Sequence, residues 1–193
     1  MNSSRRSRHL LRSLTLLLGA LASGARVARA QALPTATGPG GFIAVGAMGS
    51  GFQADFGKRW IGGGGVYADA NLTWRYGLET EVRQLRYHQE AGVRESTYLI
   101  GPRVTLRPTG VMPYAKVLVG VGGFRYPYGY AKGNYLVIAP GAGIDYSLGD
   151  RLTLRLLDFE YQDWQNFTYG HLHPYGISFG VSVRVLHGSD YPR

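Results

Sequence analysis

The sequence of 193 residues contains no cysteine. It therefore forms no disulfide, no zinc–thiolate site and no lipid anchor on an amino-terminal cysteine. A long amphipathic helical pattern is also missing, whereas the chain holds 29 glycines and 14 tyrosines. Tyrosine favours strands and glycine marks turns and bulges, so this composition indicates an all-β protein. The length suits one domain that follows a targeting segment.

Outside its first thirty residues the chain has little excess charge. The formal net charge is +9, but six arginines lie in that first stretch, namely Arg5, Arg6, Arg8, Arg12, Arg26 and Arg29. Without them, 15 basic and 12 acidic residues remain. Because the positive charge belongs mostly to the amino-terminal stretch, we expect no nucleic-acid partner.

The amino-terminal stretch lacks an apolar run of the roughly 20 residues that a membrane-spanning helix needs. Its apolar core, SLTLLLGALA at residues 13–22, follows a basic region at residues 5–12. Small residues stand at Ala28 and Ala30, directly before Gln31. This order is the pattern of a secretory signal peptide, with cleavage after Ala30.

The sequence thus predicts four parts. They are a signal peptide over residues 1–30, a lead-in segment over 31–41, a barrel over 42–186 and a short carboxy-terminal tail over 187–193.

Eight runs of the predicted barrel alternate between two kinds of residue with a period of two, which is the pattern of strands. The runs are residues 42–53, 66–74, 78–87, 97–106, 114–125, 135–146, 151–164 and 175–186. The connections predicted at residues 75–77, 107–113 and 147–150 are short, and those predicted at residues 55–65, 88–96, 126–134 and 165–174 are longer. Short turns at one end and longer loops at the other are typical of an antiparallel up-and-down barrel that spans an outer membrane.

Two runs carry additional information. The last, YGISFGVSVRVL, has apolar residues at the odd positions 177–185 and small or charged residues at the even positions 176–184. We predict that it closes the barrel by pairing with residues 42–53, whose two faces the pattern leaves unassigned. The run over residues 151–164 changes phase near Leu156 and Leu157, which predicts a β-bulge.

The polar face of the runs carries nearly balanced charge, which favours a barrel filled by its own side chains. A closed interior requires every charge to find a partner, whereas a solvated surface does not. We predict an interior charge network formed by Asp69, Glu79, Glu81, Arg83, Arg103, Lys116, Asp145, Arg155, Asp158, Glu160 and Arg184.

Aromatic residues gather near the ends of the runs, where a ring can have one wet and one apolar side. They are Trp74, Tyr87, Tyr98, Tyr114, Tyr126, Tyr146, Trp164 and Tyr175. This placement predicts girdles at the two edges of a lipid-facing belt. A soluble secreted barrel of the lipocalin kind is the alternative, and it would carry its polar face outside.

Three stretches resemble a known family in their order and spacing. They are MPYAKVLVGVGG at residues 112–123, APGAGIDYSL at 139–148 and RLTLRLLDFEYQ at 151–162. They are similar to the small outer-membrane β-barrel family, the OmpA-type transmembrane domain, and the resemblance covers residues 42–186. It implies an outer-membrane location and contact with outer-membrane lipid and lipopolysaccharide.

The last run also resembles the signal that the barrel-assembly machinery reads during biogenesis. The matching residues are Ser178, Gly180, Val183 and Val185. The chain departs from the family pattern because no aromatic residue ends this run, and residues 187–193 follow it instead.

The sequence offers little chemistry, and we predict no catalytic residue, no metal site and no cofactor. His171 and His173 with Asp163 could be drawn as a metal site, but zinc takes three or four fixed ligands. A lipid-modifying enzyme of the outer membrane is a third interpretation, although neither His88 nor His171 is followed two residues later by the serine that a deacylase needs. For surface binding, the predicted loop residues are Tyr126, Tyr128, Tyr130, Lys132 and Tyr135.

Overall fold

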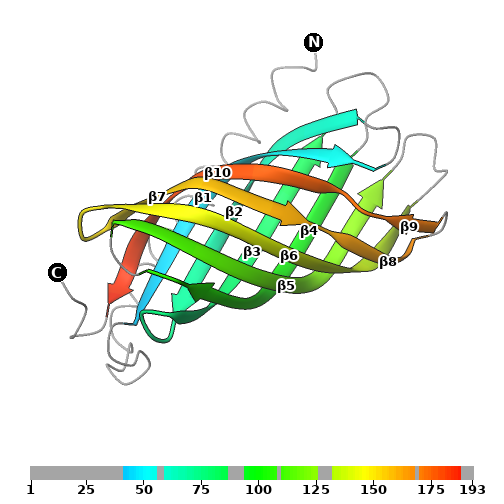
Figure 1. The fold of residues 1–193 in the computed structure, drawn as a ribbon. Coiled ribbons are helices and arrows are strands. Elements are labelled where there is room, and N and C mark those ends of the chain that lie inside the picture. Colours follow the sequence, from blue (N-terminus) through cyan, green and yellow to red (C-terminus); the bar gives the residue numbers. More distant parts are fainter. Residues whose placement is uncertain are drawn as a thin grey trace, which may run out of the picture. The chain divides into compact units, whose positions relative to one another are not determined.

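A computed structural model describes residues 41–55, 59–86, 94–107, 110–125, 132–167 and 170–187. These residues form ten strand segments, shown in Figure 1: β1 (Phe42–Ala54), β2 (Arg59–Asn71), β3 (Tyr76–Arg86), β4 (Arg94–Thr105), β5 (Val111–Arg125), β6 (Lys132–Leu148), β7 (Leu152–Tyr161), β8 (Asp163–Phe167), β9 (Gly170–Leu172) and β10 (Tyr175–His187). Among them we find no apolar helix long enough to cross a membrane.

The segments form a closed antiparallel barrel of eight strands, as predicted. Segments β1 to β7 pair in chain order, β7 also pairs with β10, and β10 pairs with β1 to complete the ring. The segments β7 and β8 both pair with β6 and act as one strand interrupted at Gln162. The short β9 pairs with β8 at the end of the chain's last hairpin (Figure 1).

The seam between β1 and β10 confirms the predicted closure. The pairing runs from Phe42 opposite His187 to Gln53 opposite Tyr175. Inside the barrel, the hydroxyl groups of Ser50 and Ser178 share a hydrogen bond of 2.8 Å across the seam. The structure also assigns the faces of β1, because Met48 and Phe52 are buried while Val45 is exposed.

The two ends of the barrel differ in their connections. We call turn end the end where residues 72–75, 106–110 and 149–151 join consecutive strands and where β1 begins. We call loop end the opposite end, where β3 and β5 end and where β4 and β6 begin. Outer-membrane barrels place short turns toward the periplasm and longer loops toward the cell exterior.

The loop predicted over residues 55–65 was wrong, because most of it is strand. Strand β2 begins at Arg59, opposite Ala54 of β1. Its glycines hold ladder positions beside β3, where a Cβ on Gly63 would lie 2.1 Å from the carbonyl oxygen of Gln84. Only glycine permits so close an approach. The predicted loop over residues 165–174 likewise contains part of β8 and β9.

The predicted β-bulge is confirmed. The register of β7 against β10 shifts between Asp158 and Arg155, and the register of β7 against β6 shifts at the same place. Two consecutive leucines therefore point outward, with Leu156 exposed by 45% and Leu157 by 38%. The bulge moves Asp158 and Glu160 into phase with the interior.

The predicted aromatic girdles are partly wrong. Tyr98, Tyr146 and Tyr175 are exposed on the outside, whereas the exposed Trp74 lies at the turn end, at the rim of an interior cavity. Tyr114 and Trp164, however, are buried inside the barrel. Each lies an even number of residues from an inward-facing polar residue of its strand, so its side chain also points inward. Tyr87 and Tyr126 lie outside the described residues.

Candidate functional site: the interior of the barrel

The charged centre of the barrel is organised around Lys116 of β5 and Arg155 of β7. The Lys116 ammonium donates to Glu79 at 2.8 Å and to Glu81 at 2.5 Å. It also donates to Asp158 at 2.7 Å. Arg155 binds both carboxylate oxygens of Glu79, at 3.0 and 2.8 Å. Because two cations share one carboxylate, the centre is a connected network and not a set of separate pairs.

Toward the loop end the network continues through Arg83 of β3. Its guanidinium donates to Glu81 at 2.6 Å and to Glu160 at 2.9 and 3.2 Å. Gln162 in turn donates to Glu160 at 2.7 Å. The indole N–H of Trp164 then donates to the Gln162 side-chain oxygen at 2.8 Å. The hydrogen-bonded chain therefore reaches a fully buried tryptophan.

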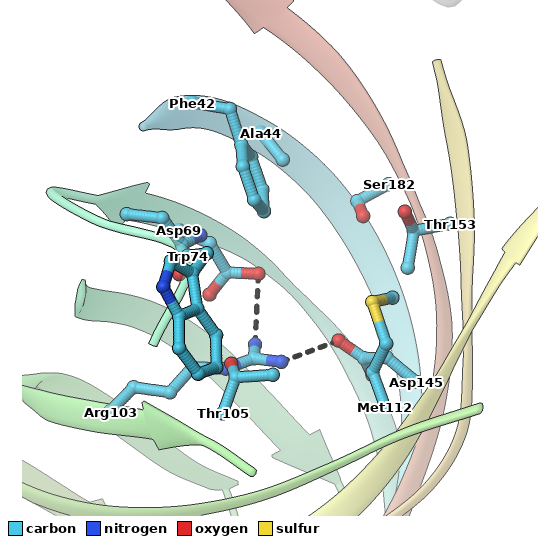
Figure 2. Close-up of a pocket in the computed structure, with 11 residues that line it drawn as sticks. Phe42, Ala44, Asp69, Trp74, Arg103, Thr105, Met112, Asp145, Thr153 and Ser182 are labelled. Atoms are coloured by element: carbon cyan, nitrogen blue, oxygen red, sulfur yellow. Dashed lines mark hydrogen bonds and ion pairs between the residues drawn. The ribbon is translucent and has the colours of Figure 1, made fainter. Parts of the chain in front are cut away.

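Toward the turn end the network continues through Arg103 of β4. Its guanidinium donates to Asp69 at 3.0 Å and to Asp145 at 2.6 Å, as Figure 2 shows. It also donates to Glu79 at 2.9 Å. A cavity of about 20 Å³ lies beside these groups, with Trp74 at its rim. That volume holds about one water molecule.

Aromatic rings line the network and stack on the arginines. The guanidinium of Arg103 lies 3.8 Å from the ring centre of Tyr114. Arg155 lies at the same distance from the ring of Tyr67. A guanidinium is weakly hydrated and stacks well on rings, so these contacts stabilise cations that have lost their water.

Three carboxylates are close enough to hold a metal ion, but a lysine already occupies the position among them. The ligand atoms of Glu79, Glu81 and Asp158 lie within 4.8 Å of one another. The Lys116 ammonium donates to all three. An ammonium supplies the positive charge that a metal would otherwise bring, so this cluster is an ion-pair centre.

The structure brings together the residues that the sequence analysis placed in the network, with one exception. Arg184 lies nearer the turn end, where it donates to the carbonyl oxygen of Asp150 and to Ser147 Oγ, each at 3.3 Å. A further buried acid escaped prediction. Glu95 is 1% exposed, and neither of its carboxylate oxygens has a hydrogen-bond partner among the described residues.

The loop half of the interior is filled by apolar side chains. One cluster comprises Leu99, Leu118, Val137, Ala139, Trp164 and Leu172, with Tyr135 packed against it. A second cluster comprises Phe52, Ala54, Ile61 and Leu85. The described interior is therefore divided into an ionic part at the centre and turn end and an apolar part toward the loops.

The other predicted site residues are dispersed. Of the signal-like residues, Ser178 points inward whereas Val183 and Val185 are exposed on the outer wall, and Gly180 lies between. Tyr126, Tyr128, Tyr130 and the cleavage residues Ala28, Ala30 and Gln31 lie outside the described residues. Tyr135 packs near Trp164, with 6.2 Å between ring centres, and Lys132 begins β6. His173 lies 3.4 Å from Asp163 and stacks on Tyr161.

Comparison with known proteins places this architecture in a class. No protein-family model and no curated protein matches the sequence. Solved structures of small outer-membrane β-barrel proteins do match its fold, as the sequence resemblance predicted.

Three of these structures illustrate the likeness. Neisserial surface protein A has a TM-score of 0.56 at 12% identity, over 75% of this chain and 97% of its own. The amino-terminal barrel domain of Pseudomonas aeruginosa OprF has a TM-score of 0.54 at 14% identity, over 75% and 98%. Pseudomonas aeruginosa OprG has a TM-score of 0.54 at 11% identity, over 77% and 97%. At these identities the likeness concerns the fold.

Proposed function

We propose that the protein is a small outer-membrane β-barrel with a filled lumen and a structural or surface-interaction role. The observation that carries this proposal is the inversion of polarity between the two sides of the wall. Arg155 inside is 1% exposed, whereas Phe179 on the outside is 52% exposed. Side chains that avoid water cover the outside, and ionic side chains fill the inside, which suits a lipid solvent.

The soluble lipocalin-like alternative requires the opposite arrangement, with apolar residues facing a ligand cavity and polar residues facing water. Fractionation of cells that produce the full chain separates the two. We expect the protein in the outer-membrane fraction, released by detergent and not by salt or alkali. Recovery in the periplasmic fraction without detergent would overturn the proposal.

We further propose that the lumen does not form a sizeable pore. The ion pairs that Arg83 and Arg103 form with acidic residues fill some levels of the interior, and the apolar cluster around Trp164 fills the next. In planar lipid bilayers we expect no steady large conductance from the folded protein, relative to bilayers that receive detergent alone. A reproducible large and stable current would contradict a filled lumen.

The same contacts favour a non-enzymatic role. A general acid or base needs a carboxyl group that can reach a substrate. Glu79 instead accepts hydrogen bonds from Arg103, Lys116 and Arg155. Acids held in this way act as structural partners of the cations.

We propose that the chain reaches the membrane through its signal peptide and is recognised by the barrel-assembly machinery through its last strand. The alternation of β10 supports the second step, because Ser178 and Ser182 are buried while Val183 and Val185 face outward. Once inserted, the outer wall contacts lipid and the loop end faces the cell exterior.

A further inference from the structure

The mouth of the barrel at the turn end carries a rim of exposed arginines. Arg75, Arg107 and Arg151 lie one in each of the three turns, and all three are exposed. The three turns contain a single acidic residue, Asp150. None of these arginines forms an ion pair with another described residue. The cations of the interior network, in contrast, lie against carboxylates, so the rim differs from the interior in being open to an external anion.

Backbone hydrogen bonds from the turns to their neighbours hold this rim in place. The bonded pairs are Thr105 N–H with the Arg75 carbonyl at 2.7 Å, Ser147 N–H with the Gly110 carbonyl at 3.1 Å and Arg184 N–H with the Arg151 carbonyl at 2.8 Å. The Thr73 hydroxyl also accepts from the N–H groups of Arg75 and Tyr76, at 3.3 and 3.1 Å. The rim therefore presents its cations from fixed backbone positions, which lowers the conformational cost of binding a ligand.

Trp74 stands at the entrance of the cavity that this rim surrounds. The residue is 40% exposed, and it lines the cavity together with Arg103 (Figure 2). The guanidinium of Arg75 lies 4.6 Å from the centre of the Trp74 ring. Because the indole borders the mouth of the barrel, contact with lipid does not account for its exposure. Its exposed part offers a large, rigid surface for a ligand beside an arginine.

The cavity presents buried donor and acceptor atoms that form no hydrogen bond with other described residues. The acceptors are Asp69 Oδ1 and Asp145 Oδ1, and the donor is Arg103 Nε. Three hydroxyl side chains complete the polar lining, those of Thr105, Thr153 and Ser182. Buried polar groups are costly to leave without partners, so the cavity favours a group that both donates and accepts. Its volume of about 20 Å³ matches one hydroxyl group or one water molecule.

We propose that the turn-end mouth binds a glycan that carries carboxylate groups, which is the chemistry of the cell wall beneath an outer membrane. The carboxylates of the glycan lie against Arg75, Arg107 and Arg151. One of its sugar rings lies against Trp74, and a hydroxyl group enters the cavity. Arginine binds a carboxylate through two parallel hydrogen bonds, which adds geometry to charge. This inference rests on the proposed outer-membrane location, which directs the turn end toward the periplasm, and it adds a site and a ligand class.

Simpler ligands match only part of this site. A phosphate group satisfies the arginines of the rim, but the free oxygens of Asp69 and Asp145 repel it. A divalent cation satisfies those oxygens, but the arginines repel it. An acidic peptide supplies carboxylates without a sugar ring for Trp74. A glycan with both hydroxyl and carboxylate groups matches the rim, the indole and the cavity together.

The test measures binding of four probes by the full chain folded in detergent micelles, with isothermal titration calorimetry. The probes are a muropeptide released from purified cell walls, an uncharged trimer of N-acetylglucosamine, poly-L-glutamate and phosphatidylglycerol. The rim variant combines Arg75→Gln with Arg151→Gln. Its charge-matched control combines Arg86→Gln with Arg94→Gln, which removes two exposed cations at the loop end. A third variant, Trp74→Leu, removes the indole and leaves every charge in place.

We expect the unaltered protein to bind the muropeptide more tightly than the other three probes. The rim variant should bind the muropeptide about 10-fold more weakly, because two exposed ion pairs together contribute about that much to an affinity. The control variant should retain the original affinity, and Trp74→Leu should lose affinity for the muropeptide but not for poly-L-glutamate.

Three results would overturn the inference. They are no binding of the muropeptide, an equal loss in the rim and control variants, and tighter binding of poly-L-glutamate or phosphatidylglycerol than of the muropeptide. The comparison of probes uses the unaltered protein, so it stands even where a variant does not fold. Fractionation of cells that produce the unaltered chain reports separately on the outer-membrane location, because the binding assay uses purified protein.

Discussion

Replacing Lys116 with methionine is expected to lower the free energy of unfolding by roughly 3–5 kcal/mol, the cost of removing one partner from a buried ion pair. The Lys116 ammonium donates to Glu79, Glu81 and Asp158, all of which are buried. Methionine keeps much of the volume but leaves these carboxylates without a shared cation. The effect should appear in urea unfolding of the barrel in lipid vesicles, monitored by tryptophan fluorescence.

A double-mutant cycle separates the lost ion pairs from lost packing. Glu81→Gln alone leaves Lys116 with three other carboxylates, those of Glu79, Asp158 and Glu160. Lys116→Met with Glu81→Gln instead removes a cation and an anion together. We expect the double variant to be less destabilised than the sum of the two single variants, because removing both partners avoids an uncompensated buried charge. Strict additivity, or a Lys116→Met variant as stable as the unaltered protein, would show that the lysine is not the centre of the network.

The substitution Trp164→Ala is expected to lower the free energy of unfolding by roughly 3–5 kcal/mol, because it leaves a cavity in the loop half of the interior. Trp164 is the largest fully buried side chain among the residues that the structure describes. Its ring lies over Gly122, where an added Cβ would lie 2.4 Å from the ring. The indole therefore fits in this position because residue 122 has no side chain. The same urea unfolding measures the loss, with Trp60 and Trp74 remaining as fluorescent probes.

Trp164→Phe serves as the matched control because it retains an aromatic ring in the cluster. It removes the indole N–H that donates to Gln162, and the unsatisfied acceptor should cost about 1–3 kcal/mol. A phenylalanine variant as unstable as the alanine variant would assign the effect to the hydrogen bond. An alanine variant of unchanged stability would show that the apolar cluster contributes little to the barrel.

Most features of the fold could be predicted from the alternation of polar and apolar residues along the sequence. It located the bulge at Leu156 and Leu157, because two consecutive leucines break a period of two in a visible way. It also identified β10 as the closing strand, since one of its faces is wholly apolar. Binary patterning has this power in a barrel because each wall residue meets either the lumen or the outside.

The same pattern failed where a side chain suits both sides of the wall. Tyr114 and Trp164 were expected in the girdles, but tyrosine and tryptophan are as able to stack on buried arginines or fill a lumen as to sit at an interface. Residues 55–65 were predicted to form a loop, whereas Gly63 and Gly65 instead permit the close approach of β2 and β3.

The sequence predicted which residues belong to the candidate site better than it predicted which of these residues contact one another. The alternation of polar and apolar positions along each strand identified the charged residues of the interior, from Asp69 to Glu160. Glu95 was missed because its strand was expected to begin at Thr97, two residues after it, and the structure begins β4 at Arg94. Which cation faces which acid depends on the stagger between strands, and no single strand's sequence encodes that.

The seam has a consequence for the order in which the barrel can fold. Every other pairing joins strands that are neighbours along the chain, so each can form as a local hairpin while the rest of the chain is unfolded. The seam joins Ser50 to Ser178, 128 positions apart. Closing a longer loop adds only about 0.6 kcal/mol for each doubling of its length, so the seam is not thermodynamically expensive. It is, however, the least local contact of the ring, and such contacts make folding slow. Until it closes, β1 and β10 expose unpaired backbone groups, and a lipid environment penalises such edges strongly. A sheet held open at this point therefore needs protection until the first and last strands meet.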